Sequence, residues 1–210
     1  MKIRKVGIIG AGAMGSGISQ ICAQAGWLTV IYDPYPESLE RCKKTILDFW
    51  KGGVDKGKNT SDDILSWQEN LVLSGDIADA SKEVDLIIEA VPENINLKRS
   101  IFKELDKLAP SESVLATNTS ALSISEIASA TNNPDRVIGM HFFNPVPLMP
   151  LLEIVRHDLI SEDVISTAVE DDQSELYAEV EQNILLLLDT VPSLTQSKLK
   201  SLYMTQFGKG

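Results

Sequence analysis

Several residue types are scarce in this chain of 210 residues, and each scarcity narrows the class of protein. There are two cysteines, Cys22 and Cys42, both in segments predicted to be helical, which indicates no disulfide framework and favours a reducing compartment. Basic residues number 19 against 30 acidic ones, and the formal charge of −11 argues against nucleic acid and anionic membranes as partners. No apolar run approaches the roughly 20 residues that cross a bilayer. Because the first predicted strand begins close to Met1, we expect no targeting peptide and a cytoplasmic location.

Glycine is concentrated near the start of the chain, between two predicted strands. Gly10, Gly12 and Gly15 have the spacing G-x-G-x-x-G, with the apolar segment 6–9 before them and a helical apolar pattern after them. This context is typical of a turn that binds a dinucleotide, since its glycines allow the backbone to approach a pyrophosphate at a helix N-terminus. Asp33 ends the next strand, where an acid binds the adenosine ribose and repels a 2′-phosphate. The segment therefore predicts NAD rather than NADP, with a packing turn that binds no ligand as the alternative.

Strand and helix patterns alternate along the rest of the chain as far as residue 155. Strands are predicted at 71–73, 84–91, 114–117, 136–143 and 151–155, and helices at 97–108 and 123–130. This alternation predicts an α/β fold with an open, mostly parallel, doubly wound sheet. We expect residues 37–70 to form an inserted helical hairpin, with a first helix at 37–51 and with Gly52, Gly53 and Gly57 breaking the chain after it. Lys43, Lys44, Lys51, Lys56 and Lys58 gather there, either as a solvated helix face or as a patch for a phosphorylated substrate tail.

Polar side chains stand where the predicted parallel strands end, and ligands bind at that edge of such sheets. Asp33, Glu93, Ser120 and His141 all fall at these positions, and Asn144 and Glu153 follow. A histidine beside a hydride acceptor can take the proton that leaves a hydroxyl as it becomes a ketone. A carboxylate on the other ring nitrogen would fix the tautomer, and a serine hydroxyl could hold the substrate oxygen. The chain has two histidines, His141 and His157, and a core position for His141 is the alternative. No metal site is predicted.

Four segments carry a resemblance to a known family: G-A-G-A-M-G-S-G-I-S-Q at 10–20, E-A-V-P-E-N at 89–94, N-T-S-A-L at 118–122 and G-M-H-F-F-N-P-V-P-L-M-P-L-L-E-I-V at 139–155. Together they resemble the L-3-hydroxyacyl-CoA dehydrogenases, especially the short-chain 3-hydroxybutyryl-CoA members, from about residue 3 to residue 169. The segment H-F-F-N-P-V-P is much more specific than the glycine turn. The resemblance implies a Rossmann-type NAD-binding domain over residues 1–169 and a role in fatty acid metabolism.

The resemblance also implies a role for individual residues. His141 is the expected base, Glu153 its partner, and Ser120 the residue that positions the substrate oxygen. The expected NAD contacts are Gly10, Gly12, Ala13, Met14, Gly15, Asp33, Glu93, Lys98, Ser120 and Asn144. The hairpin lysines lie where the family receives coenzyme A, and the segment 145–149 could form part of an apolar wall for the acyl chain or only turn the chain.

The sequence departs from the family pattern after about Val169. The family continues with an asparagine-containing catalytic motif and an all-helical domain, and no matching residues follow here. Residues 170–210 instead predict a short helical tail. Its first helix ends at Pro192 and has apolar residues at helical spacing, namely Leu176, Tyr177, Val180, Ile184, Leu187, Leu188 and Val191, and a last helix is expected at 195–207. The tail is expected to cover the sheet or to pair with a second copy in a homodimer.

Three functions remain open on the sequence. The first is NAD-dependent, reversible oxidation of an (S)-3-hydroxyacyl-CoA to a 3-ketoacyl-CoA. The second is a non-catalytic NAD-binding or structural protein without the helical domain, and the third is a hydroxy-acid dehydrogenase that does not use coenzyme A.

Overall fold

The computed structural model describes residues 3–149, 151–165 and 184–188. Its elements are, in chain order, β1 (Lys5–Ile9), α1 (Ala13–Gln24), β2 (Leu28–Tyr32), α2 (Pro36–Asp55), α3 (Ser61–Glu69), β3 (Leu71–Ser74), β4 (Leu86–Glu89), α4 (Ile95–Leu108), β5 (Val114–Thr117), α5 (Ile124–Ala128), η1 (Pro134–Arg136), β6 (Val137–Phe142), η2 (Val146–Leu148), β7 (Leu152–Arg156) and β8 (Ile184–Leu188). The strands form one sheet in the order β3-β2-β1-β4-β5-β6-β7-β8. Every pairing is parallel except that of β6 with β7, so the predicted open and mostly parallel sheet is confirmed.

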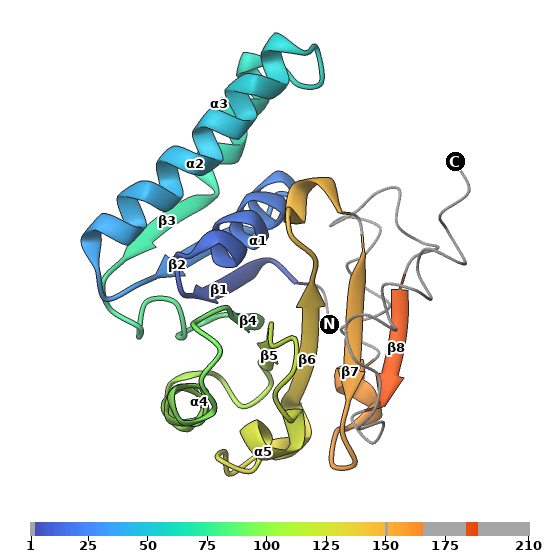
Figure 1. Ribbon diagram of the computed structural model, residues 1–210. Coiled ribbons are helices and arrows are strands. Elements are labelled where there is room, and N and C mark those ends of the chain that lie inside the picture. The colour runs from blue at the N-terminus through green and yellow to red at the C-terminus, as the bar shows by residue number, and fades with distance from the viewer. Residues whose placement is uncertain (1–2, 150, 166–183, 189–210) are drawn as a thin grey trace.

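Helices cover both faces of this sheet (Figure 1). On one face, Ile18, Ile21 and Cys22 of α1 pack with apolar residues from β1, β4, β5, β6 and β7. On the other face, Phe102 and Leu105 of α4 and Ile127 of α5 pack with a second buried set. Because β1, β2, β4, β5 and β6 are parallel, their carboxyl ends lie along one edge of the sheet. The winding direction reverses between β1 and β4, and ligands bind beside such a reversal at the carboxyl edge.

The first helix, α1, ends at a glycine. Gly26 has φ of +84°, a left-handed conformation that glycine adopts without a steric penalty. Its N–H donates to Ala23 and the N–H of Trp27 donates to Cys22, which closes the last turn by a Schellman motif. The turn directs the chain straight into β2, whose end carries Asp33.

The predicted helical hairpin is present and extends away from the sheet (Figure 1). Thr60 caps α3 in a reciprocal pair of hydrogen bonds with Asp63. The expectation that Gly52 and Gly53 break the first helix is wrong, because α2 continues to Asp55. Gly53 leaves room there for the side chain of Asn59, which donates to the carbonyl of Trp50. The helix ends before Gly57, which has φ of +66°.

The tail departs from its predicted conformation at residues 184–188. These form β8, which pairs in parallel with β7, whereas a helix was expected from Leu176 to Val191. A continuous apolar run such as I-L-L-L-L fits a buried strand as well as a helix, and periodicity cannot separate the two. The other residues of the expected tail helices lie outside the described residues. In the part of the chain that the structure describes, no helix is long and apolar enough to cross a membrane.

Candidate active site

The glycine turn after β1 has the shape that a pyrophosphate requires. Gly10 has φ of +107°, and a Cβ there would lie 2.9 Å from the carbonyl oxygen of Ala90. A Cβ on Gly15 would lie 1.8 Å from the carbonyl oxygen of Gly10, so Gly15 allows α1 to pack against the turn. A Cβ on Gly12 would meet nothing within 4 Å, and no side chain caps the helix that Gly12 begins. Two glycines thus serve close packing, while the third opens the N-terminus of α1 to a phosphate group.

Asp33 lies directly after β2, beside the glycine turn. Its Oδ2 accepts a hydrogen bond of 3.0 Å from the N–H of Ala11, and its Oδ1 accepts one of 3.0 Å from the N–H of Tyr35. Each carboxylate oxygen has a second lone pair, so the group can still accept hydrogen bonds from a ribose. The backbone contacts fix the carboxylate beside the glycine turn, and its role in selecting NAD stays a prediction.

A buried ionic network follows β4. Lys98 of α4 is 1% exposed, and its Nζ lies 2.6 Å from Oε1 of Glu89, which is itself fully buried. The same Nζ lies 3.4 Å from Oε2 of Glu93 and donates to the carbonyl of Val91 at 3.3 Å. The predicted cofactor residues Glu93 and Lys98 are therefore brought together.

The carboxylate of Glu93 holds the loop that carries Ser120. Its Oε1 accepts hydrogen bonds from the Thr119 hydroxyl, from the N–H of Ser120 at 3.0 Å and from the N–H of Ala121 at 3.3 Å. Partial burial alone would raise the pKa of Glu93, but the hydrogen bond from Thr119, the charge of Lys98 and the Ser120 N–H outweigh it, so this pKa is lowered. These contacts favour the ionised carboxylate, so their stabilising effect is present above the ordinary glutamate pKa and declines as the pH falls through the lowered pKa.

His141 and Glu153 face each other across two antiparallel strands. They are register partners in the β6–β7 ladder, and Nδ1 of His141 lies 2.7 Å from Oε2 of Glu153. The histidine ring also lies against Phe143, with ring centroids 4.6 Å apart. Since an ionised carboxylate only accepts hydrogen bonds, Nδ1 carries the proton and Nε2 of the neutral ring is a base. The predicted pairing of these two residues is present.

Asn118 joins the loop after β5 to the strand that carries His141. Its side-chain Oδ1 accepts a hydrogen bond of 2.8 Å from the N–H of Phe142, and its own N–H donates to the carbonyl of Glu89. The ends of β4, β5 and β6 are thus connected, and the Glu93–Ser120 group and the His141–Glu153 pair are held at the same edge of the sheet.

The second histidine has a structural role. His157 is buried, its Nε2 lies 2.9 Å from the carbonyl oxygen of Val137, and its Nδ1 accepts the N–H of Leu159. Both ring nitrogens therefore have partners: Nε2 links the end of β7 to the start of β6, and Nδ1 holds the turn after β7. This arrangement leaves His141 as the histidine that can serve a reaction.

Replacing His157 with Phe is expected to lower stability and to leave turnover unchanged. The ring volume is kept, but the buried carbonyl of Val137 and the N–H of Leu159 lose their partners, at a cost of about 1–3 kcal/mol. Urea denaturation measures the loss, and a kcat within twofold of wild type separates this histidine from the site. A collapse of kcat at full stability would contradict the structural role.

The loop after β6 packs on the cofactor helix. It contains Asn144, which is exposed, and continues through Pro145 into η2. A Cβ on Gly17 of α1 would lie 2.8 Å from Cβ of Val146, so this glycine allows η2 to lie against α1. The cofactor contact expected of Asn144 and the acyl-binding role expected of 145–149 stay predictions.

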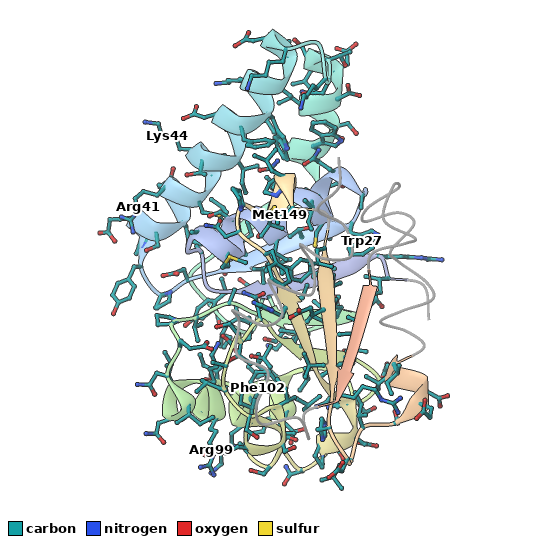
Figure 2. The ribbon with its side chains drawn as sticks, turned by 45° about the vertical axis from the view of Figure 1, so that its right-hand side comes forward. Trp27, Arg41, Lys44, Arg99, Phe102 and Met149 are labelled. Atoms are coloured by element: carbon teal, nitrogen blue, oxygen red, sulfur yellow. The ribbon has the colours of Figure 1, made fainter. Side chains whose placement is uncertain are left out.

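The five hairpin lysines are all exposed. Figure 2 shows Lys44, together with Arg41, projecting away from α2. Their expected contact with a phosphorylated substrate tail stays a prediction.

Sequence reasoning assigned no role to Glu89, Asn118 or Thr119, although the first two are central to the connections at this edge. A signal for Glu89 was present, because a carboxylate directly after the buried run L-I-I must find a partner inside the fold. Asn118 and Thr119 follow β5, but their partners are distant in sequence and only the fold brings them together.

Comparison with known proteins shows which family the chain resembles. Residues 5–174 match the model of the 3-hydroxyacyl-CoA dehydrogenase NAD binding domain. A probable 3-hydroxybutyryl-CoA dehydrogenase of Bacillus subtilis is 42% identical over 163 residues, which cover 78% of this chain and 56% of that protein. The 3-hydroxybutyryl-CoA dehydrogenase of Clostridioides difficile is 42% identical over 169 residues, which cover 79% of this chain and 59% of that protein. The chain thus spans a little over half the length of these curated relatives.

A solved structure has a similar fold. The crystal structure of (S)-3-hydroxybutyryl-CoA dehydrogenase PaaH1 from Ralstonia eutropha superposes with a TM-score of 0.86 at 32% identity, covering 100% of this chain and 74% of that one. The family match, the glycine turn and the polar edge of the sheet point to the same conclusion: the chain belongs to the 3-hydroxyacyl-CoA dehydrogenase family and contains its NAD-binding domain.

Proposed function

We propose that this protein oxidises an (S)-3-hydroxyacyl-CoA to a 3-ketoacyl-CoA with NAD, in a reversible reaction that belongs to fatty acid metabolism. The observation that carries the proposal is the His141–Glu153 pair, 2.7 Å between Nδ1 and Oε2, at the cofactor edge of an NAD-binding domain. The names of the relatives support the substrate class.

His141 acts as the general base through Nε2. In the oxidation direction Nε2 takes the proton of the 3-hydroxyl group, and in the reverse direction the imidazolium returns it to the ketone oxygen. Glu153, buried beneath the ring, keeps the proton on Nδ1 and stabilises the imidazolium that forms. The carboxylate therefore controls which nitrogen faces the substrate.

Ser120 positions the substrate oxygen from the loop after β5. Its N–H and hydroxyl both point at Oε1 of Glu93, at 3.0 and 3.5 Å, so the backbone of this residue has a fixed anchor. The long hydroxyl contact leaves Oγ able to turn toward a substrate. Asn144, in the loop after β6, is a further polar residue at the carboxyl edge of the sheet.

The glycine turn and Asp33 are the residues that would hold NAD, whose nicotinamide supplies the hydride acceptor when bound. The N-terminus of α1, with its first residues Ala13 and Met14, would bind the pyrophosphate, and Asp33 would accept hydrogen bonds from the ribose hydroxyls. Glu93 and Lys98 complete the cofactor site toward β4. We further propose that the hairpin lysines bind the coenzyme A phosphates, that the protein acts in the cytoplasm, and that it forms a homodimer.

The function is tested by the oxidation of NADH in the presence of acetoacetyl-CoA. We expect turnover that depends on the thioester, and little with free acetoacetate. Equal rates with the free acid would assign the protein to hydroxy-acid dehydrogenases that do not use coenzyme A. NADH binding without turnover above the His141→Asn variant would make it a non-catalytic NAD-binding protein.

A further inference from the structure

Glu89 is a fully buried carboxylate that the proposed reaction does not use directly. It is the last residue of β4, and its side chain reaches three elements. Oε1 accepts the N–H of Val91 at 2.7 Å and the ammonium of Lys98 at 2.6 Å, while Oε2 accepts the hydroxyl of Thr117 at 2.7 Å. The removal of two charges from water is costly, and an apolar pair of similar volume is often at least as stable. Stability alone therefore does not account for the buried pair.

Lys98 transmits the position of Glu89 toward the site. Its ammonium is engaged by three oxygens, those of Glu89, Val91 and Glu93. The strong contact is with Glu89, and the contact with Glu93 is longer, at 2.6 against 3.4 Å. Two carboxylates contact the Lys98 ammonium in the described residues, those of Glu89 and Glu93. If Glu89 carried no charge, the ammonium would move toward Glu93.

Glu93 then connects this pair to Ser120. One oxygen faces Lys98, and the other accepts the Thr119 hydroxyl and the two N–H groups of Ser120 and Ala121. A shift of this carboxylate toward a closer ammonium would lengthen the bonds to the two N–H groups. The chain of contacts from Glu89 to the backbone of Ser120 is continuous.

We propose that Glu89 is a positioning residue, whose charge holds Lys98 back from Glu93 and so fixes the loop 119–121 that carries Ser120. This inference rests on the proposed function for its effect on turnover. Its structural part concerns the loop alone and can be measured without substrate.

The test uses Glu89→Gln, with Thr117→Val as the matched control. Glutamine keeps the size of the side chain and can satisfy the Val91 N–H and the Thr117 hydroxyl, so the change removes mainly the charge. Valine at 117 removes a hydrogen bond to the same carboxylate and leaves the charge in place. Both variants are measured as the full chain, with thermal unfolding as the check on folding.

Amide hydrogen exchange by NMR gives the substrate-free readout. We expect exchange at Ser120 and Ala121 to accelerate about tenfold or more in Glu89→Gln and to stay within twofold of wild type in Thr117→Val. Unchanged exchange in Glu89→Gln, or equal acceleration in both variants, would overturn the proposal.

Turnover gives the second readout. We expect kcat with acetoacetyl-CoA to fall about tenfold or more in Glu89→Gln, in line with the cost of small displacements of reacting groups. In a Ser120→Ala background the same change should have no further effect, because both changes act through one hydroxyl. Additive losses of kcat in the double variant would overturn the positioning role of Glu89. If the wild-type protein shows no turnover, the proposed function is overturned, and the hydrogen-exchange result alone decides whether Glu89 positions the loop.

Discussion

Replacing His141 with Asn is expected to lower kcat about 10²–10⁴-fold, the range that a general base contributes. Asparagine places an NH₂ group near the position of Nδ1, so Glu153 keeps a donor at the 2.7 Å contact. The ring nitrogen that faces the substrate is lost. NADH affinity and the unfolding temperature should stay close to wild type, because the glycine turn and the sheet are unchanged.

Three measurements separate this outcome from a general defect: NADH oxidation with acetoacetyl-CoA, NADH binding by fluorescence, and thermal unfolding. The His157→Phe variant is the matched control, with lower stability and normal kcat. A His141→Asn enzyme with at least a tenth of wild-type kcat would remove His141 from the role of base. Glu153→Gln should give an intermediate loss, because the amide oxygen can still accept the Nδ1 proton but carries no charge.

The largest expected loss of stability follows replacement of Lys98 with Met. Methionine fills a similar volume but leaves the carboxylate of Glu89 fully buried without a counter-ion. Breaking a buried pair from one side costs about 3–5 kcal/mol. For a chain of this size each kcal/mol lowers the unfolding temperature by about 2–4 °C, so we expect a fall of about 6–20 °C.

The double variant Glu89→Gln/Lys98→Met tests the cause of that loss. It removes both charges, while the glutamine oxygen can accept from the Val91 N–H and the glutamine NH₂ can donate to the Thr117 hydroxyl, so we expect at least half of the lost stability to return. Urea denaturation of the two single variants and the double variant gives the coupling between the residues. Equal stability of Lys98→Met and the double variant would show that a change in packing at position 98, not the unpaired charge of Glu89, caused the defect.

The fold was predictable because its signals are local. The buried strands, the glycine turn and the caps at Gly26 and Thr60 each follow from a few neighbouring residues. The glycines of α2 led to a wrong prediction of where this helix ends. A contact with Asn59, several residues further along the chain, keeps the helix intact past Gly53. The run 184–188 was predicted as a helix but forms a strand. An apolar segment of this kind takes its conformation from its neighbour, which here is the edge of β7.

The site was predictable in its residue types but not in its connections. His141, Ser120 and Glu93 stand at strand ends, and their chemistry could be inferred from position. That Glu93 anchors the Ser120 loop, and that Glu89 stands behind Lys98, depends on contacts between residues up to 28 positions apart. Such contacts are set by strand order and register, which the sequence pattern does not specify.

The pairing of β6 with β7 has a consequence for how the chain tolerates insertions and deletions. His141 meets Glu153 only in the observed register, and a slip of one residue would turn the carboxylate to the other face of the sheet. That face holds the apolar core of Leu152 and Ile154, where an unpaired charge is costly. The burial of Leu152 and Ile154, which stabilises β7, therefore also disfavours any register in which His141 and Glu153 do not meet. Changes in length should be accepted in the connecting loop and rejected within either strand, so a folded protein with a misaligned base is an improbable product of mutation.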